Sequence, residues 1–300
     1  MFLKTLVGQT ILEISKRSQQ KYIRTLSQCI QRNMASKLFS GEADRFRGIT
    51  VHSNVELCES SDLAKKLEES LDYWRENNKR TIWFKVYLEQ SDWVPHLAKK
   101  GFKYHHAKED YVMMYLWLPI DESNNIPAYA HTLVGVGGIV VNDKSQILVV
   151  REKYATRVFW KLPGGYAEPG ENLVDTAIRE VREETNITTE FQSVIAFRHT
   201  HGRVYNCSDI YVVVSLRPTS NDIQKSNQEI SECLWMDIQE YLNHPEIHSL
   251  NKQLVQKYLE YKEKNIRISC ESGVHQVLKV PYTFYSVEED GDVAKEEIKS

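Results

Sequence analysis

The N-terminal half of the chain shows apolar spacings typical of both helices and strands. Apolar positions step by four, four and three residues from Leu63 to Trp74, which predicts a helix. Residues 81–88 alternate between an apolar face and a more polar face, the pattern of a strand. A short helix over 93–100 and a strand over 111–118 follow. We therefore expect a small α/β domain over residues 44–120.

The following stretch predicts a linker and a second domain. Residues 119–127 are rich in Pro, Asp, Asn and Ser, which is typical of a linker. Strands over 133–141 and 146–151 are joined by turn residues, which predicts a β-hairpin. A Gly/Pro loop, a strongly patterned helix, two more strands and a last helix follow, over 162–170, 172–185, 191–199, 210–216 and 249–264. We expect a second domain over 127–265 and a C-terminal extension over 266–300 that ends in an acidic tail.

The first 41 residues form a basic segment. They contain seven Lys or Arg but only one acid, Glu13, although the whole chain has a net charge of -3. Apolar side chains recur at helical spacing from Ile23 to Leu38, as in an amphipathic mitochondrial presequence. A docking helix or a loose N-terminal arm has the same pattern, so a mitochondrial and a cytoplasmic location both stay open.

Composition argues against several classes of protein. The five cysteines are scattered and never form a C-x-x-C pair, which argues against a disulfide framework or a zinc site. No stretch is apolar enough for a membrane-spanning helix, so we expect no membrane partner. A net charge of -3 gives no overall attraction to nucleic acid.

Three glutamates cluster on one face of the patterned helix. At 100° per residue, Glu180, Glu183 and Glu184 lie within about 100° of arc, so their charges repel one another. A hard divalent cation such as Mg²⁺ or Mn²⁺ takes oxygen ligands and is commonly shared between carboxylates and substrate phosphates. Arg179 can pair with Glu183 or with Glu171 and hold the preceding loop against the helix. The competing interpretation is a solvated acidic helix face.

These residues belong to a longer motif. The chain has Gly165, five residues, Glu171, seven residues, and then Arg179-Glu180-Val181-x-Glu183-Glu184-x-Asn186-Ile187. This segment resembles the Nudix box, the signature of the Nudix hydrolases. Only Asn186 departs from it, where the family has the glycine that ends the helix in a left-handed conformation. Asparagine adopts that conformation next most readily, so we expect the geometry to be retained.

The resemblance implies a fold and a reaction. The fold class is α/β: a Nudix α/β/α sandwich with a mixed sheet, preceded by a small acetyltransferase-like α/β domain. Residues 46–51 and 101–107 resemble the branch that includes plant ADP-ribose and NADH pyrophosphatases and the protein encoded antisense to basic fibroblast growth factor. The implied reaction is attack of a metal-activated water on a pyrophosphate linkage, with Mg²⁺ or Mn²⁺ as the cofactor.

The resemblance also implies site residues. The expected metal ligands are Glu180 and Glu184, supplemented by Glu183 and Gly165. Glu183 and Arg179 are expected to take part in catalysis, and Glu229 is the general-base candidate outside the motif. Aromatic and basic residues near the motif are candidates for binding the base and the phosphates of the substrate: Trp160, Lys161, Tyr166, Arg198 and His199.

The substrate is the least determined part of the interpretation. A nucleotide is expected, and ADP-ribose or an NADH-like dinucleotide is the first candidate. Capped RNA is an alternative within the same chemistry. A nucleotide-binding regulatory protein with weak turnover is an alternative of another class, although the intact acidic cluster argues against it. A homodimer stays possible.

Overall fold

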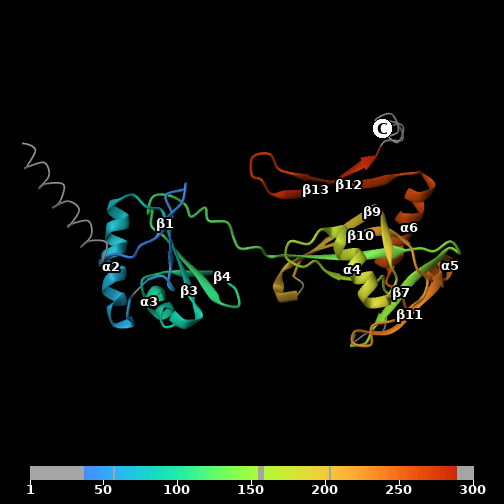
Figure 1. The fold of residues 1–300 in the computed structure, drawn as a ribbon, viewed down its shortest axis with the longest axis horizontal. Coiled ribbons are helices and arrows are strands. Elements are labelled where there is room, and N and C mark those ends of the chain that lie inside the picture. The colour runs from blue at the N-terminus through green and yellow to red at the C-terminus, as the bar shows by residue number, and fades with distance from the viewer. Residues whose placement is uncertain (1–36, 57, 155–158, 203, 289–300) are drawn as a thin grey trace, which may run out of the picture. The chain divides into compact units, whose positions relative to one another are not determined.

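The chain folds into two compact units in a computed structural model, with the division between Ala130 and His131. The structure describes residues 37–56, 58–154, 159–202 and 204–288 (Figure 1). Residues 1–36 of the possible presequence and the last residues of the expected acidic tail lie outside these ranges. No helix in the described ranges is long and apolar enough to cross a membrane.

The described residues of the first unit form a five-stranded sheet with two helices. The strand order is β1-β2-β3-β5-β4, and only the β2–β3 pair is parallel. The strands are β1 (Glu42–Ala43), β2 (Ile49–His52), β3 (Thr81–Tyr87), β4 (Lys103–Ala107) and β5 (Tyr111–Trp117). The helices are α2 (Ser60–Glu76) and α3 (Trp93–Lys99), and a 3-10 turn, η1 (Leu88–Gln90), follows β3. The helices and the strands β3 and β5 match the sequence prediction.

The apolar stripe of α2 forms the core of this unit. Leu63, Leu67, Leu71 and Trp74 are buried and belong to one cluster with the alternate positions of β3, Ile82, Phe84 and Val86. The periodicities of helix and strand that predicted these elements are therefore the periodicities of burial. The expected likeness of this unit to acetyltransferases stays a prediction.

The segment predicted as a linker is attached to the uncovered face of this sheet. Residues 119–130 make four contacts with side chains of β4 and β5: two through backbone oxygens, one through the side chain of Asn124 and one through the ring of Tyr129. They are Trp117 Nε1 donating to Glu122 O at 3.1 Å, Asn124 Nδ2 donating to Tyr115 Oη at 3.4 Å, His105 Nε2 on Pro127 O at 3.0 Å, and His106 stacked on Tyr129 at 4.3 Å. We call residues 119–130 the strap.

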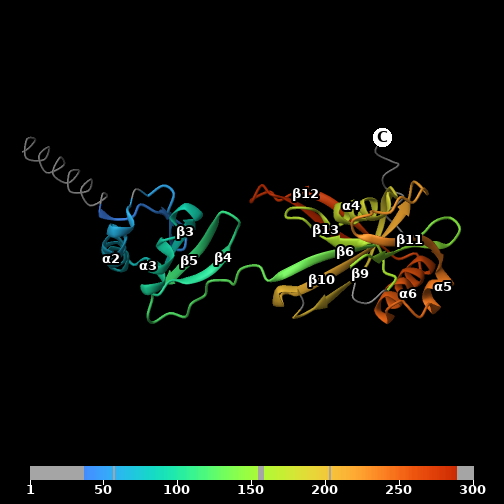
Figure 2. The same cartoon turned by 90° about the horizontal axis from the view of Figure 1, so that it is seen from below.

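The second unit is an α/β/α sandwich around a mixed four-stranded sheet of order β8-β6-β10-β9. The β6–β10 pair is parallel and the other pairs are antiparallel. Its strands are β6 (Thr132–Val140), β8 (Gly164–Tyr166), β9 (Thr189–Thr200) and β10 (Ser208–Pro218). The helices are α4 (Leu173–Thr185), α5 (Ile238–Asn243) and α6 (Ser249–Glu263). A short 3-10 segment, η2 (Val204–Asn206), precedes β10, and Figure 2 shows this unit from a second direction.

Alternate residues of β10 face the two helical layers. Val212 and Val214 belong to the buried cluster that contains Ala177 and Val181 of α4. Val213, between them, belongs to the cluster that contains Tyr241 of α5 and Leu254 and Val255 of α6. The sheet is thus covered on both faces, which confirms the predicted sandwich.

The predicted hairpin over 133–151 is only partly present. The turn forms, since Asn142 N–H donates to Gln146 O at 3.0 Å and Val141 bridges Ile147. Beyond this turn the strands separate: β6 pairs with β8 and β10, whereas β7 (Gln146–Glu152) pairs with β11 (Ile230–Asp237). The prediction that the two strands pair along their length was wrong. The turn residues determine only the local geometry, and each strand pairs with strands from distant parts of the chain.

The C-terminal extension contains a β-hairpin that the sequence analysis did not anticipate. It consists of β12 (Arg267–Val274) and β13 (Pro281–Glu288). Ile268 N–H donates to Ser193 Oγ at 3.0 Å, and Thr283 Oγ1 donates to Asn172 Oδ1 at 2.9 Å. These bonds attach the hairpin to β9 and to the start of α4.

Candidate active site

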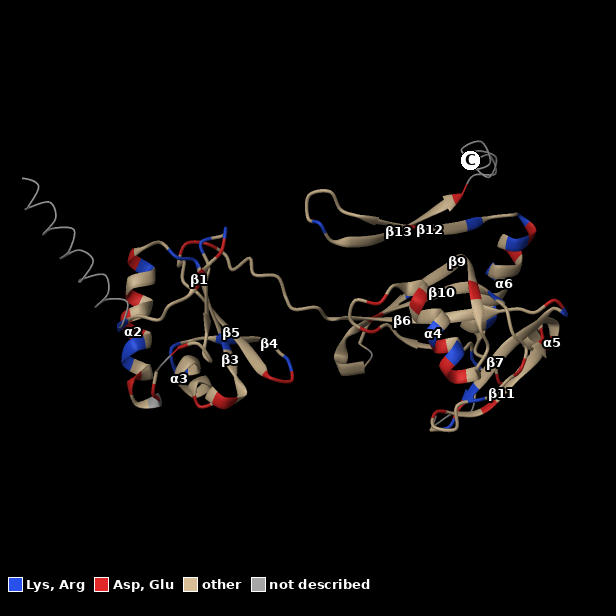
Figure 3. Cartoon of the chain, viewed as in Figure 1, with Lys and Arg blue, Asp and Glu red and all other residues tan. Residues whose placement is uncertain are grey.

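Helix α4 carries the acidic motif, and its sequence determines which face it buries and where it ends. Buried Ala177 and Val181 fix the helix on the sheet, and charged residues of both signs occupy its remaining surface (Figure 3). Asn186 follows the helix with φ of 64°, a left-handed residue whose N–H donates to Arg182 O at 2.8 Å. The prediction that Asn186 adopts the left-handed conformation of the family glycine is confirmed.

Two glutamates of α4 lie against the glycines of β8. Gly164 N–H donates to Glu184 Oε2 at 2.9 Å. A Cβ added at Gly165 would lie 2.5 Å from Glu180 Oε1, so only glycine lets that carboxylate approach the strand. Gly164 has φ of 152° and a Cβ there would lie 2.1 Å from Val136 O, so a side chain is excluded at this position too.

Arg179 connects the loop before α4 to the acidic face. Its guanidinium donates to both carboxylate oxygens of Glu171 at 2.8 and 2.9 Å, and to Glu180 at 2.8 Å and Glu183 at 3.1 Å. It also donates to Tyr166 O at 3.2 Å. Hydrogen bonds from Arg179 are the main reason that the pKa of Glu171 is lowered to about 2. Both pairings expected for Arg179, with Glu171 and with Glu183, are present.

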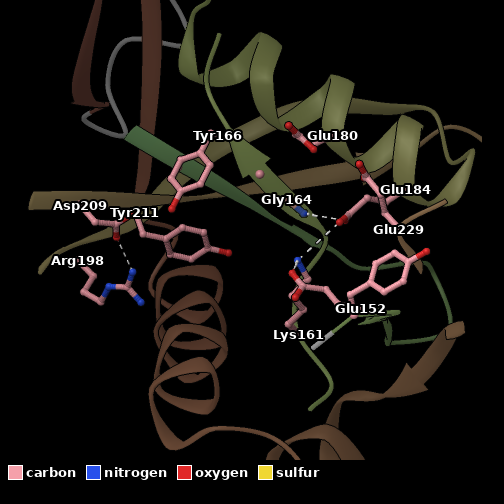
Figure 4. A pocket seen from close by; sticks show the side chains of 13 residues that line it. Glu152, Lys161, Gly164, Tyr166, Glu180, Glu184, Arg198, Asp209, Tyr211 and Glu229 are labelled. Atoms are coloured by element: carbon pink, nitrogen blue, oxygen red, sulfur yellow. Dashed lines mark hydrogen bonds and ion pairs between the residues drawn. The ribbon is translucent and has the colours of Figure 1, made fainter. Parts of the chain in front are cut away.

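A cavity of about 620 Å³ opens beside this arrangement (Figure 4). Five carboxylates line it, and four of them lie at one end: Glu180 and Glu184 from α4, Glu152 from β7, and Glu229 from the segment before β11. Lys161 is the basic group among them, with Nζ 2.5 Å from Glu152 Oε1 and 3.6 Å from Glu184 Oε1. This end of the cavity is therefore acidic, and the Lys161 ammonium group lies among its carboxylates.

Burial raises the pKa of the two helix glutamates. The side chain of Glu184 is only 6% exposed, and this desolvation raises its pKa to about 7, although Lys161 and the Gly164 N–H oppose the shift. Desolvation also raises the pKa of Glu180, against the effect of Arg179. Burial alone would lower the pKa of Lys161, but the adjacent Glu184 and Glu152 raise it. Added positive charge at these carboxylates would offset the cost of their burial.

The other end of the cavity has a different character. It is lined by Tyr166, Gly135, Tyr211, Arg198 and Asp209. Figure 4 shows the two tyrosine rings between the Arg198–Asp209 pair and the glutamates. Aromatic rings and a neutralised ion pair suit the uncharged part of a ligand.

The structure brings together most of the predicted site residues. Glu180, Glu184, Gly165, Glu229, Lys161, Tyr166 and Arg198 all line the cavity. Glu183 does not: its side chain is 59% exposed and is held by Arg179 at 3.1 Å. The expectation of three glutamates around one cation is thus reduced to two, because Glu183 projects from α4 outside the cavity.

Two of the aromatic candidates lie elsewhere. Trp160 is 4% exposed and packs in the core beneath the guanidinium of Arg151, so its ring does not reach a ligand. His199 is exposed and packs against His201, outside the cavity. Successive side chains of a strand point to opposite faces of the sheet. In β9, Arg198 faces the cavity, so the next residue, His199, faces away from it. The structure therefore places neither residue at the cavity, and their binding roles stay predictions.

The sequence analysis missed six cavity residues: the glycines Gly135 and Gly164, and Glu152, Tyr154, Asp209 and Tyr211. Asp209 and Tyr211 stand two residues apart at the start of a predicted strand, a spacing that places polar side chains on the same face. Nothing local marks Glu152 and Tyr154, which reach the cavity because β7 pairs with β11.

The donor set fits a hard divalent cation in its chemistry. Carboxylates and a backbone carbonyl such as that of Gly165 are the oxygen ligands that Mg²⁺ and Mn²⁺ take. No three acidic, His or Cys side chains of the described residues converge to metal-binding spacing. Instead, Arg179 donates to Glu180 and Glu183, and Gly164 N–H donates to Glu184.

Comparison with known proteins gives matches to both units. The model of the Nudix hydrolase domain matches residues 39–118, and that of the NUDIX domain matches residues 131–258. Nudix hydrolase 5 of Arabidopsis thaliana is 38% identical over 213 residues, which cover 69% of this chain and 70% of that protein. Such a stretch is longer than either matched domain and therefore includes parts of both.

Two further relatives agree. Nudix hydrolase 8 of Arabidopsis thaliana is 40% identical over 207 residues, covering 68% of this chain and 56% of that protein. Nucleoside diphosphate-linked moiety X motif 6 of Homo sapiens is 37% identical over 205 residues, covering 66% of this chain and 65% of that protein. This chain thus spans little more than half the length of the first of these relatives. Taken with the acidic helix and its glycines, these matches show that the chain belongs to the Nudix hydrolase family.

Proposed function

We propose that this protein hydrolyses the pyrophosphate bond of a nucleoside diphosphate derivative with Mg²⁺ or Mn²⁺, and that ADP-ribose or an NADH-like dinucleotide is its substrate. The observation that carries the proposal is the position of the Glu180 and Glu184 carboxylates against the Gly164–Gly165 backbone, inside a cavity that also holds Lys161. The name of the human relative refers to a moiety linked to a nucleoside diphosphate, which agrees with this substrate class.

Glu180, Glu184 and the carbonyl of Gly165 would hold the divalent ion. A bound ion of this kind supplies water of lowered pKa and neutralises charge on phosphate oxygens. Arg179 acts as a positioning residue, since it fixes the direction of the Glu180 carboxylate. Lys161 is placed to contact a phosphate oxygen, because its Nζ lies among the same carboxylates.

Glu229 is the proposed general base. It lines the cavity from the segment before β11, beside the α4 glutamates in Figure 4, and its side chain is exposed. A base at this position can take a proton from a water held next to these carboxylates. Glu229→Gln is then expected to reduce turnover more than it reduces binding of substrate.

The test is hydrolysis by the purified full chain with Mg²⁺ or Mn²⁺. The substrates are ADP-ribose, NADH, diadenosine polyphosphate, coenzyme A and capped RNA, and the products are separated by chromatography. We expect nucleoside monophosphate from ADP-ribose or NADH, its loss in Glu184→Gln, and no change in Glu240→Gln, an exposed control on α5. Equal product release by wild type and Glu184→Gln contradicts the proposal. Cleavage of capped RNA alone, or binding without cleavage, favours the corresponding alternative.

A further inference from the structure

Four residues of the second unit form one row across the sheet. Gly135 of β6 pairs with Tyr166 of β8 on one side and with Tyr211 of β10 on the other. Tyr211 in turn pairs with Arg198 of β9. Directly paired residues face the same side of a sheet, so the two tyrosines flank a glycine and the arginine follows. All four line the cavity.

The glycines of β6 make space for the ring of Tyr211. A Cβ at Gly137 would lie 1.8 Å from Tyr211 Oη, and a Cβ at Gly135 would lie 3.4 Å from Tyr211 Cδ2. The ring therefore lies over the strand backbone and forms the floor of this end of the cavity. Tyr166 is 49% exposed and provides a wall. Two aromatic rings on either side of a glycine suit a flat aromatic ring of a ligand, which can stack on them.

Asp209 closes this end of the cavity. It stands two residues before Tyr211, is 6% exposed, and its Oδ1 accepts a hydrogen bond from Arg198 Nη2 at 2.7 Å. Arg198 also lies over the Tyr211 ring, 5.2 Å from its centroid. A buried carboxylate repels phosphate but accepts hydrogen bonds from N–H donors beyond the one that Arg198 supplies. The diphosphate therefore belongs near Lys161, and an uncharged group with an N–H donor belongs near Asp209.

Building on the proposed hydrolase function, we propose that the nucleobase stacks on Tyr166 and Tyr211 and that Asp209 accepts a hydrogen bond from the base amino group. This arrangement selects adenine over hypoxanthine, which has a carbonyl in place of the amino group. A carbonyl oxygen facing the Asp209 carboxylate leaves two acceptors opposed, which disfavours binding. Arg198 holds the carboxylate in place as a positioning residue.

Two measurements on the full chain test this proposal. One compares kcat/KM for ADP-ribose with kcat/KM for its hypoxanthine analogue, IDP-ribose, in the presence of Mg²⁺. The other compares the Kd values of AMP and IMP by calorimetry without metal, which does not depend on turnover. Both are made on wild type, Asp209→Asn, Asp209→Glu and Asp143→Asn, an exposed control in the turn after β6.

Wild type is expected to prefer the adenine compounds by on the order of tenfold or more in both measurements. Asp209→Asn should abolish or reverse the preference, because an amide can donate to the hypoxanthine carbonyl, while Asp209→Glu and Asp143→Asn should keep it. The proposal is overturned if wild type uses the adenine and hypoxanthine compounds equally. It is also overturned if Asp209→Asn weakens kcat/KM and binding by the same factor for the adenine and the hypoxanthine compounds. If hydrolysis depends on Glu184 without base preference, only this proposal fails. If AMP is preferred through Asp209 but nothing is hydrolysed, the hydrolase function fails instead.

Discussion

The carboxylate of Glu184 accepts a hydrogen bond from the backbone N–H of Gly164, 20 residues earlier in the chain, at 2.9 Å. This bond joins the C-terminal half of α4 to the strand β8 and places a buried acid at the wall of the cavity. A neutral residue could still make this bond, because a glutamine side-chain oxygen is also an acceptor. The acid is thus not required by the fold, which points to a role for its charge.

Replacing Glu184 by Gln separates activity from stability. The variant keeps the acceptor for Gly164 N–H and removes a carboxylate whose pKa burial raises to about 7. We expect kcat/KM to fall by more than about 100-fold, since even residues that only support metal ligands are worth about 10- to 100-fold. Tm measured by differential scanning fluorimetry in EDTA should stay equal or rise. A large decrease in Tm would mean that the charge stabilises the fold.

Arg179→Lys tests the positioning role of the guanidinium. Lysine keeps the charge but cannot make paired hydrogen bonds to Glu171 while also reaching Glu180 and Glu183. We expect kcat to decrease by about 10- to 100-fold while KM changes little. Steady-state kinetics with ADP-ribose give the two constants. An effect confined to KM would indicate that Arg179 contacts the substrate instead.

Stability should depend on pH through Glu171. Hydrogen bonds from Arg179 lower its folded pKa from 4.5 to about 2, so its stabilising effect is present above pH 4.5 and is lost as pH falls toward 2. We expect Glu171→Gln to reduce the free energy of unfolding by about 1–3 kcal/mol at pH 7. Denaturant titrations in EDTA should show this difference shrinking between about pH 4.5 and pH 2. A difference that stays constant over that range contradicts the pairing.

Gly165→Ala should disturb the site through Glu180. The added Cβ would lie 2.5 Å from Glu180 Oε1, the far end of a side chain that can move away. We therefore expect a decrease in activity of more than about tenfold with only a small change in Tm. Gly164→Ala is the informative comparison, because its Cβ would meet backbone atoms and should lower Tm strongly. If both variants lowered Tm equally, a movable side chain would not be what distinguishes Gly165 from Gly164.

The strap should be released by changes on the first unit. His106 stacks on Tyr129 at 4.3 Å, and His105 Nε2 contacts Pro127 O at 3.0 Å. We expect His106→Ala to speed chymotrypsin cleavage after Tyr129 several-fold, measured by mass spectrometry of timed digests. Hydrolysis of ADP-ribose should be unaffected before digestion. Cleavage at the wild-type rate would mean that these contacts do not restrain the strap.

Local features of the sequence were sufficient for several elements, such as α2, β3 and α4, and for half of the site. The stripe from Leu63 to Trp74 and the motif on α4 have periods that report burial directly. The consequence of Asn186 followed from the conformational preference of a single residue. The relation of Arg179 to Glu171 followed from spacing, because the two residues lie on one helix and the loop that precedes it.

The other half of the site depends on pairing between distant strands. The row that contains Gly135, Tyr211 and Arg198 exists because β6 runs parallel to β10, a register that no local pattern specifies. The same limit explains the hairpin that was predicted for β6 and β7. Trp160 and Glu183 were misplaced for a simpler reason, since residue type near a motif does not tell which way a side chain points.

Calorimetric titration with Mn²⁺ tests the central claim most directly, because it asks whether the α4 carboxylates hold a divalent ion without reference to any substrate. Wild type and the exposed control Glu240→Gln are expected to bind Mn²⁺ alike, and Glu180→Gln and Glu184→Gln to bind it at least about tenfold more weakly. Equal Mn²⁺ affinity in all four proteins would contradict the account.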